Sequence, residues 1–301
     1  MHILITGLTG YIGSHLARRL LAQGEHQVFG LVRNPLHTTY IEDIQNQITL
    51  LPCDGEGMNV LAQVERCRPD LVYHLAAYYT GAHDMDNTTQ LVASNIAYGA
   101  YLLEAMASCE CRNLICATSI MEHCQGDAYR PLNLYAATKR AFRDLLAYYT
   151  DTGLLRAGTL VLADTYGPGD RRSKVLNLIL DAARSHRAID LSDGQQDYAA
   201  VHIDDVTEAF ILAGKQLVSG EWENQQFQVL PDAIPSLRKT VETMVKICGL
   251  TVQTNWGTRP APDRDMRHAP RLYPPVPGWS PRISLEQGLA GLWSGSKGAL
   301  T

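Results

Sequence analysis

Residues 2–13 read His2-Ile3-Leu4-Ile5-Thr6-Gly7-Leu8-Thr9-Gly10-Tyr11-Ile12-Gly13, and this stretch decides the fold. It begins with a short apolar run rich in β-formers, as in a buried parallel strand, and residues 14–21 continue with helical spacing. Gly7 suits a tight turn, Gly10 would let the backbone approach a pyrophosphate, and Gly13 would let helix and strand pack closely. The stretch therefore predicts a strand, a phosphate-binding turn and a helix; the alternative is a tight turn in another kind of α/β protein.

Composition excludes several classes of function. The 301 residues carry 26 Lys and Arg against 31 Asp and Glu, a formal net charge of −5, which argues against a nucleic-acid-binding surface. No apolar run approaches the roughly 18 residues of a membrane span, and the N-terminus lacks the basic region of a signal peptide. The seven cysteines are scattered, and Cys109-Glu110-Cys111 has neither redox nor zinc spacing. We expect a cytoplasmic protein with reduced thiols, no metal site, and neither a membrane nor a nucleic acid as partner.

Alternating strand and helix patterns continue to about residue 163. We expect strands at 27–32, 48–51, 71–75, 113–117 and 157–162, with helices near 60–67, 86–107 and 134–152. Such alternation predicts an α/β fold with a doubly wound parallel Rossmann sheet. We assign residues 1–163 and about 195–220 to the dinucleotide-binding domain. Residues 164–194 and 221–301, including a proline-rich surface segment at 259–281, are assigned to a smaller substrate-binding lobe.

A second motif places acid–base chemistry on this framework. Tyr135 and Lys139 lie four residues apart on one helix face, and Ser119 ends a predicted strand. An isolated pair of this kind is usually a solvated helix pair, but here all three would converge at the carboxyl edge of the sheet. Tyrosine has a pKa of about 10, and lowering it by about three units needs roughly 4 kcal/mol. Lys139 and an oxidised nicotinamide ring could supply this, while Ser119 would hydrogen-bond a substrate carbonyl oxygen.

Together these motifs resemble the extended short-chain dehydrogenase/reductases, the family of nucleotide-sugar epimerases, dehydratases and reductases. The resemblance also includes His74-Leu75-Ala76-Ala77, Asn95-x-x-Gly99 and Tyr166-Gly167-Pro168-Gly169, and it covers nearly the whole chain. It implies catalysis by Ser119, Tyr135 and Lys139. It implies a cofactor site in which Asp54 meets the adenine and whose remaining members are Gly7, Thr9, Gly10, Tyr11, Ile12, Gly13, Arg33, Leu75, Ala76, Ala77, Tyr135 and Lys139.

Three departures from the family pattern select among its activities. Arg33 stands where NAD-binding members carry an acidic residue, which favours NADPH through a contact with its 2′-phosphate; a solvated surface arginine is the alternative. Ser119 is followed by Ile120 and Met121, not by the acidic pair of the dehydratases, so dehydration is not expected. Glu122 and His123 are expected at the pocket edge or on the surface. The short strand at 201–203 lacks the preceding arginine that holds a diphosphate in many epimerases.

The leading hypothesis is NADPH-dependent reduction of the 4-keto group of a CDP- or dTDP-linked 6-deoxyhexose. A narrower resemblance to such reductases supports it, through 131–139, 164–170 and Pro277-Gly278-Trp279-Ser280-Pro281. The alternatives are a 4-epimerase with tightly bound NAD, a reductase of a non-sugar carbonyl, and a non-catalytic NADPH-binding protein. The expected substrate-binding residues are Thr80, Ser119, Asp164, Lys174, Asn177 and Arg267.

The two long predicted helices carry more apolar surface than one sheet face requires. Leu145, Leu146, Tyr148 and Tyr149 do not fit a single stripe of the helix expected at 134–152. Relatives pair these helices, so we expect a homodimer; burial under the smaller lobe is the alternative.

Overall fold

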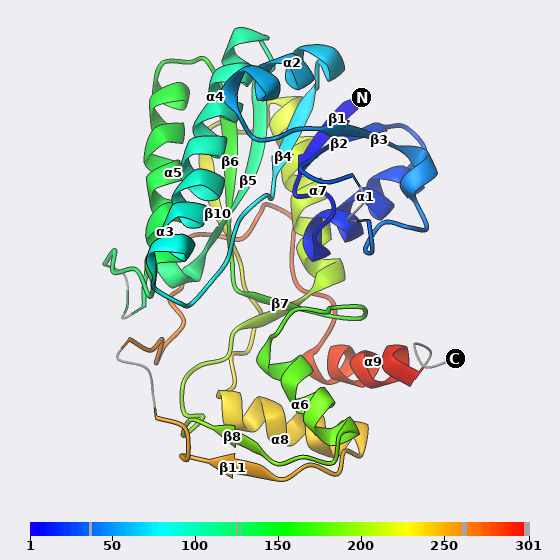
Figure 1. Ribbon diagram of the computed structural model, residues 1–301, viewed down its shortest axis with the longest axis vertical. Coiled ribbons are helices and arrows are strands. Elements are labelled where there is room, and N and C mark those ends of the chain that lie inside the picture. The colour runs from blue at the N-terminus through cyan, green and yellow to red at the C-terminus, as the bar shows by residue number, and fades with distance from the viewer. Residues whose placement is uncertain (36–37, 125, 127, 261–263, 298–301) are drawn as a thin grey trace.

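Seven parallel strands form the central sheet of the computed structural model, which describes residues 1–35, 38–124, 126, 128–260 and 264–297. The spatial order β10-β6-β5-β4-β1-β2-β3 reverses between β1 and β4 (Figure 1), and such a reversal opens a crevice at the carboxyl ends of the strands. The predicted doubly wound α/β fold is confirmed. The strands are β1 (His2–Thr6), β2 (Gln27–Val32), β3 (Ile48–Pro52), β4 (Leu71–His74), β5 (Asn113–Ser119), β6 (Arg156–Leu162) and β10 (Gln225–Val229).

Successive residues of β1 point to opposite faces of the sheet and enter different parts of the core. Ile3 and Ile5 pack with α1 (Tyr11–Ala22) and α7 (Ile203–Ser219). Leu4 packs on the other face with α2 (Gly57–Cys67), α4 (Tyr98–Ser108) and α5 (Leu134–Asp151). Figure 1 shows these helices on either side of the sheet. Both faces are covered, which explains why β1 reads as an uninterrupted apolar run.

The helix expected at 86–107 contains a wide turn in its middle. The chain passes from α3 (Met85–Val92) through a π-helical segment (Ala93–Ala97, η2) into α4. Asn95 in this segment is buried, accepts a hydrogen bond from Tyr78 N at 2.8 Å and donates to Thr138 Oγ1 at 2.9 Å. The wide turn thereby fixes the loop after β4 against α5, at the carboxyl edge of the sheet.

A smaller group of elements lies beyond that edge, below the sheet in Figure 1. It contains two two-stranded parallel sheets, β7 with β9 and β8 with β11, and its helices share an apolar cluster that includes Leu176, Val241 and Leu289. Its elements are β7 (Asp164–Tyr166), α6 (Val175–Arg184), β8 (Ile189–Leu191), β9 (Ala200–His202), α8 (Leu237–Cys248), β11 (Thr254–Trp256) and α9 (Leu285–Lys297). In the part of the chain that the structure describes, no helix combines the length and the apolar character needed to cross a membrane.

Assigning all of 221–301 to the smaller lobe was wrong. β10 pairs with β6 as an edge strand of the large sheet and buries Phe227 and Val229 in the main core. The chain also returns to this core later, where Val276 and Trp279 are buried. The Trp279 indole N–H donates to the Asp205 carbonyl of α7 at 2.8 Å. The proline-rich stretch is therefore partly internal, with 261–263 outside the described residues.

Candidate active site

The turn between β1 and α1 is so tight that two of its glycines leave no space for a side chain. Gly7 has φ of +72°, and a Cβ there would lie 2.7 Å from Ala76 N in the loop after β4. A Cβ on Gly13 would lie 2.3 Å from Gly7 O, so the first turn of α1 packs directly on the strand end. Gly10 is the N-cap of α1 and provides no side-chain cap, which leaves the backbone N–H groups of the first turn open to an anion.

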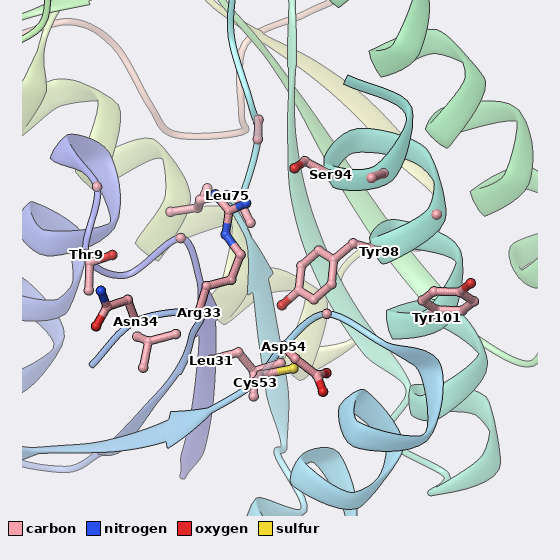
Figure 2. A pocket seen from close by; sticks show the side chains of 18 of the residues that line it. Thr9, Leu31, Arg33, Asn34, Cys53, Asp54, Leu75, Ser94, Tyr98 and Tyr101 are labelled. Atoms are coloured by element: carbon pink, nitrogen blue, oxygen red, sulfur yellow. The ribbon is translucent and has the colours of Figure 1, made fainter. Parts of the chain in front are cut away.

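A cavity of about 570 Å³ lies between this turn, the ends of β2 and β3, and the π-helical segment. Figure 2 shows Arg33 reaching from the end of β2 toward Leu75, with Thr9 on one side and Tyr98 on the other. Asp54 enters from the loop after β3, where its carboxylate accepts a hydrogen bond from Glu56 N at 2.9 Å. The structure thus brings together most of the expected cofactor set: Gly7, Thr9, Gly10, Arg33, Asp54, Leu75, Ala76 and Ala77.

Five residues of the expected cofactor set do not line this cavity: Tyr11, Ile12, Gly13, Tyr135 and Lys139. Tyr11 turns toward the loop after β7, where its hydroxyl donates to Pro168 O at 3.3 Å and its ring packs under the Arg172 guanidinium at 4.7 Å. Ile12 packs against the main core. Tyr11, Ile12 and Gly13 could therefore meet a phosphate only through their backbone N–H groups, in the first turn of α1.

The sequence analysis missed Ser94, Tyr98 and Tyr101, which line the cavity from the π-helical segment and α4. Their spacing of four and then three residues puts them on one face of a helix, and that spacing could have revealed them. Burial raises the pKa of Tyr98, while the Arg33 guanidinium opposes this rise. The charge of Arg33 therefore acts on the Tyr98 hydroxyl within the cavity.

The three expected catalytic residues come from two elements that pack against each other. Ser119 ends β5, and its Oγ accepts a hydrogen bond from Met121 N at 3.2 Å. α5 packs on β5 and on the turn that follows Ser119, and it begins one residue before Tyr135. Asn133 caps this helix by accepting from Ala136 N at 3.0 Å. The ring of Tyr135 meets the edge of the Tyr79 ring at 5.0 Å, and Lys139 follows one turn later, nearly buried.

The electrostatic environment differs from the expectation that Lys139 lowers the pKa of Tyr135. Burial raises the pKa of Tyr135, with further upward contributions from Tyr79 and Glu122, and Arg172 is the charge that opposes this. Lys139 is not among the dominant influences on that phenol. The pKa of Lys139 is itself lowered by burial, and Cys116 and Glu122 counteract that effect.

Lys139 also affects a histidine beneath the site. Burial and the Lys139 charge lower the pKa of His74 to about 3. The neutral ring is hydrogen-bonded through Nδ1 to Thr6 Oγ1 at 2.8 Å, between β4 and β1. At neutral pH the protein therefore carries an uncharged His74 beside Lys139.

Three of the expected substrate residues, Thr80, Asp164 and Lys174, lie around Tyr79, whose ring meets that of Tyr135. Lys174 Nζ forms an ion pair with Asp164 Oδ1 at 2.7 Å and sits 5.2 Å from the centre of the Tyr79 ring. Tyr79 is half exposed and bridges this pair to Tyr135, a position that the sequence analysis missed. Thr80 follows Tyr79, and its hydroxyl accepts from Ala82 N at 3.0 Å.

The other two expected substrate residues are engaged elsewhere. Arg267 pairs with Asp193 at 3.2 Å and with Asp265 at 3.3 Å, and the Asn177 side chain donates to Arg172 O at 2.9 Å.

The expectation for Glu122 and His123 was wrong. Both are buried, and Glu122 has no exposed surface at all. Its carboxylate pairs with Arg143 of α5 at 2.6 Å and accepts a hydrogen bond from the Thr118 hydroxyl. A buried charge requires a charged partner, and that partner lies 21 residues away, where local sequence gives no indication of it.

Comparison with known proteins assigns the family. Residues 3–228 match the model of the NAD dependent epimerase/dehydratase family. CDP-abequose synthase of Yersinia pseudotuberculosis is 30% identical over 76% of this chain and 78% of its own length. UDP-glucose 4-epimerase of Mycolicibacterium smegmatis is 26% identical over 96% of each chain.

Solved structures agree with the fold. UDP-glucose 4-epimerase of Thermotoga maritima, solved with UDP-glucose, superposes with a TM-score of 0.86 at 20% identity and full coverage of both chains. The Thermus thermophilus UDP-glucose 4-epimerase complex with NAD gives a TM-score of 0.84 at 22% identity, again over both full chains. Sequence, glycine turn and topology thus agree, and the chain belongs to the NAD-dependent epimerase/dehydratase family.

Proposed function

We propose that this protein is an NADPH-dependent reductase of the 4-keto group of a CDP- or dTDP-linked 6-deoxyhexose. The observation that carries the proposal is the position of Arg33 in the same cavity as the glycine turn. The sequence match to a CDP-abequose synthase supports the substrate class. The apolar residues Ile120 and Met121 after Ser119 support reduction over dehydration, because neither can transfer a proton.

The cavity suits a phosphorylated dinucleotide. Gly7 and Gly10 line the cavity at the N-terminus of α1, where the backbone N–H groups of the first turn could meet a pyrophosphate. Arg33 offers a planar set of donors to a 2′-phosphate, and Asp54, which lines the same cavity, would meet the adenine. When bound, NADPH supplies the hydride for the reaction.

The protein's own residues would manage the proton. Ser119 would hydrogen-bond the carbonyl oxygen, and Tyr135 would donate its phenolic proton to that oxygen as the alcohol forms. The environment of Tyr135 favours the protonated phenol, which is the form that a general acid needs. Arg172 is the charge that lowers the pKa of this phenol, so we propose that it acts together with Lys139, one turn later on α5, to stabilise the phenolate that remains.

Substrate recognition is proposed for the surface around Tyr79. Asp164 and Lys174 provide an acceptor and a cation within reach of a sugar hydroxyl and a diphosphate, with Thr80 beside them. Asn177 and Arg267 would take part only after exchanging their present partners.

A 4-epimerase with permanently held NAD is the second candidate. The match to UDP-glucose 4-epimerase over 96% of each chain favours it, and the same three residues could remove and return the hydroxyl proton, while NAD, when bound, would supply the hydride chemistry. Retained NAD after purification would support the epimerase, whereas exchangeable NADPH supports the reductase. Reduction of a non-sugar carbonyl and binding of NADPH without chemistry are the remaining alternatives.

The test mixes purified protein with NADPH and a panel of CDP-, dTDP-, UDP- and GDP-linked 4-keto-6-deoxyhexoses while the absorbance of NADPH is followed. The proposal expects consumption with one or more CDP- or dTDP-linked sugars. Binding of NADPH with no consumption on any member would contradict it.

We also propose a homodimer that forms through α4 and α5. Leu145 and Tyr148 of α5 remain exposed, whereas Leu146 is buried and Tyr149 hydrogen-bonds Glu104 at 2.8 Å. The exposed apolar side chains are the ones that a partner would cover. Light scattering at micromolar concentration should give twice the chain mass, and a monomer mass would reject the dimer.

The free thiols of all seven cysteines support a reducing compartment, the cytoplasm.

A further inference from the structure

An ion pair buried beside the proposed catalytic residues has no part in the chemistry described so far. Glu122 lies three residues after Ser119, at the end of the short turn η3 (Ile120–Glu122). Its side chain is wholly buried and is held by two donors, the Thr118 hydroxyl and Arg143 Nη1 at 2.6 Å.

Arg143 extends this contact to three further elements. It lies on α5, one turn after Lys139 and two turns after Tyr135. Its second terminal nitrogen donates to Gln226 Oε1 on β10 and, at 3.4 Å, to the hydroxyl of Tyr273. The guanidinium therefore joins the catalytic helix, the edge of the large sheet and the segment that returns from the smaller lobe.

Stability does not explain why a charged pair occupies this place. Removing two charges from water costs free energy, and a well-packed apolar pair of similar volume often stabilises a protein as well or better. Apolar contacts do not fix the relative orientation of the side chains that they join, whereas ion pairs and hydrogen bonds fix both distance and orientation. The useful property of the pair is therefore the geometry that it imposes on the elements it connects.

We propose that Glu122 and Arg143 are positioning residues, whose ion pair fixes the turn that carries Ser119 against the helix that carries Tyr135 and Lys139. Ser119 and Tyr135 must address one carbonyl oxygen, yet they come from different elements, and a displacement of about 1 Å can cost about 100-fold in rate. The inference rests on the proposed function to the extent that these three residues perform acid–base chemistry; it does not depend on which sugar is reduced.

The charges around the site add a second readout. Lys139 faces Glu122, Cys116 and His74, and Tyr135 faces Glu122, Tyr79 and Arg172. The charged or titratable groups around Glu122 are Arg143, Arg140, His123, Lys139, Cys116, Tyr129 and Tyr135. Glu122 raises the pKa of both Lys139 and Tyr135. Neutralising Glu122 should therefore move the basic limb of the pH–rate profile to lower pH.

The experiment compares three variants of the full chain. Glu122→Gln keeps the shape of the side chain but leaves Arg143 without its counter-charge. The triple variant Thr118→Val, Glu122→Leu, Arg143→Met replaces the ion pair and the hydroxyl that donates to it by apolar side chains. The matched control Asp181→Asn, Arg184→Gln removes an exposed ion pair of 3.1 Å on α6.

Thermal unfolding, kcat, KM for the reduced ketosugar and Kd for NADPH are measured for each. We expect Glu122→Gln to lower the Tm, to reduce kcat about 10- to 100-fold and to shift the basic limb downward. The triple variant should recover most of the Tm but keep the loss in kcat, with Kd and KM within about threefold of the wild type. The control should match the wild type in every measurement.

Recovery of kcat together with the Tm in the triple variant would overturn the proposal, as would folded Glu122→Gln with unchanged kcat. A readout without substrate separates this outcome from failure of the proposed function. The chain has six lysines, so the Nζ signal of Lys139 can be assigned by NMR with a Lys139→Arg variant. If the wild type reduces no ketosugar, a lower Lys139 pKa in Glu122→Gln would support the placement of the Glu122–Arg143 pair beside Lys139. An unchanged Lys139 pKa would overturn that placement.

Discussion

Two glycines of the opening turn should fail in different ways when each gains a methyl group. At Gly13 the new Cβ would lie 2.3 Å from Gly7 O and 2.8 Å from Leu8 Cα, both backbone atoms that cannot rotate away. Ordinary contact begins near 3.4 Å, so α1 must retreat by about 1 Å. Overpacking of this kind costs about 1–3 kcal/mol. Gly13→Ala should therefore lower the Tm of this 301-residue chain by roughly 2–5 °C and weaken NADPH binding.

Gly10 has a different environment. Its φ of −89° suits any residue, and the nearest atom to an added Cβ is Gly7 O at 3.2 Å. That contact is only about 0.2 Å inside the ordinary limit, so Gly10→Ala should lower the free energy of unfolding by about 1 kcal/mol at most, less than Gly13→Ala. Because Gly10 lines the cavity where the pyrophosphate is proposed to lie, we expect the added methyl group to act mainly on cofactor binding. A loss of at least about 1.4 kcal/mol, or tenfold in Kd, is expected.

The assay pairs thermal unfolding with fluorescence titration of NADPH. Gly81→Ala is the matched control, because Gly81 is exposed and an added Cβ would meet nothing within 4 Å. Wild-type affinity in Gly10→Ala would refute the assignment of the cavity. Wild-type stability in Gly13→Ala would refute the packing argument.

Two other predictions test the electrostatics. Arg33→Ser should raise the Kd for NADPH about tenfold and leave the Kd for NADH unchanged, because an exposed arginine–phosphate pair contributes about 1–2 kcal/mol. Both values are measured in parallel titrations, and an equal effect on the two cofactors would contradict this prediction. His74 has a folded pKa lowered to about 3, so the unfolded chain takes up a proton first and the free energy of unfolding falls as pH drops from about 6.5. Between about pH 6 and 4 the free energy of unfolding, measured by urea unfolding, should lose a pH slope of about 1.4 kcal/mol per pH unit in His74→Asn. The exposed control His186→Asn should keep that slope, and equal slopes in the two variants would refute the assignment.

Much of the fold could be predicted because its signals are local. The apolar run before Gly7 and the glycine spacing after it specify the first strand, turn and helix within 13 residues. Alternation of strands and helices then leaves few topologies, since parallel crossovers have a fixed hand. The position of β10 could not be predicted in this way. A short strand pairs wherever an edge is open, and its neighbour β6 lies more than 60 residues earlier in the chain.

The candidate site was predictable where family motifs name single residues, and less so where contacts are distant in sequence. Arg33 and Asp54 line the cavity as expected. Tyr79 was missed because a tyrosine in a loop carries no pattern of its own. Glu122 was misplaced because a charged residue is normally exposed, and only the position of Arg143 in the folded chain explains its burial.

The measurement that tests the central claim most directly is the turnover of Tyr135→Phe with NADPH and the sugar that the wild type reduces best. General-acid catalysis contributes about 100-fold or more. The account predicts that kcat falls by at least this factor while the Kd for NADPH stays within about threefold. Tyr149→Phe, on the same helix but bonded to Glu104, should retain wild-type turnover. Undiminished kcat in Tyr135→Phe would contradict the account.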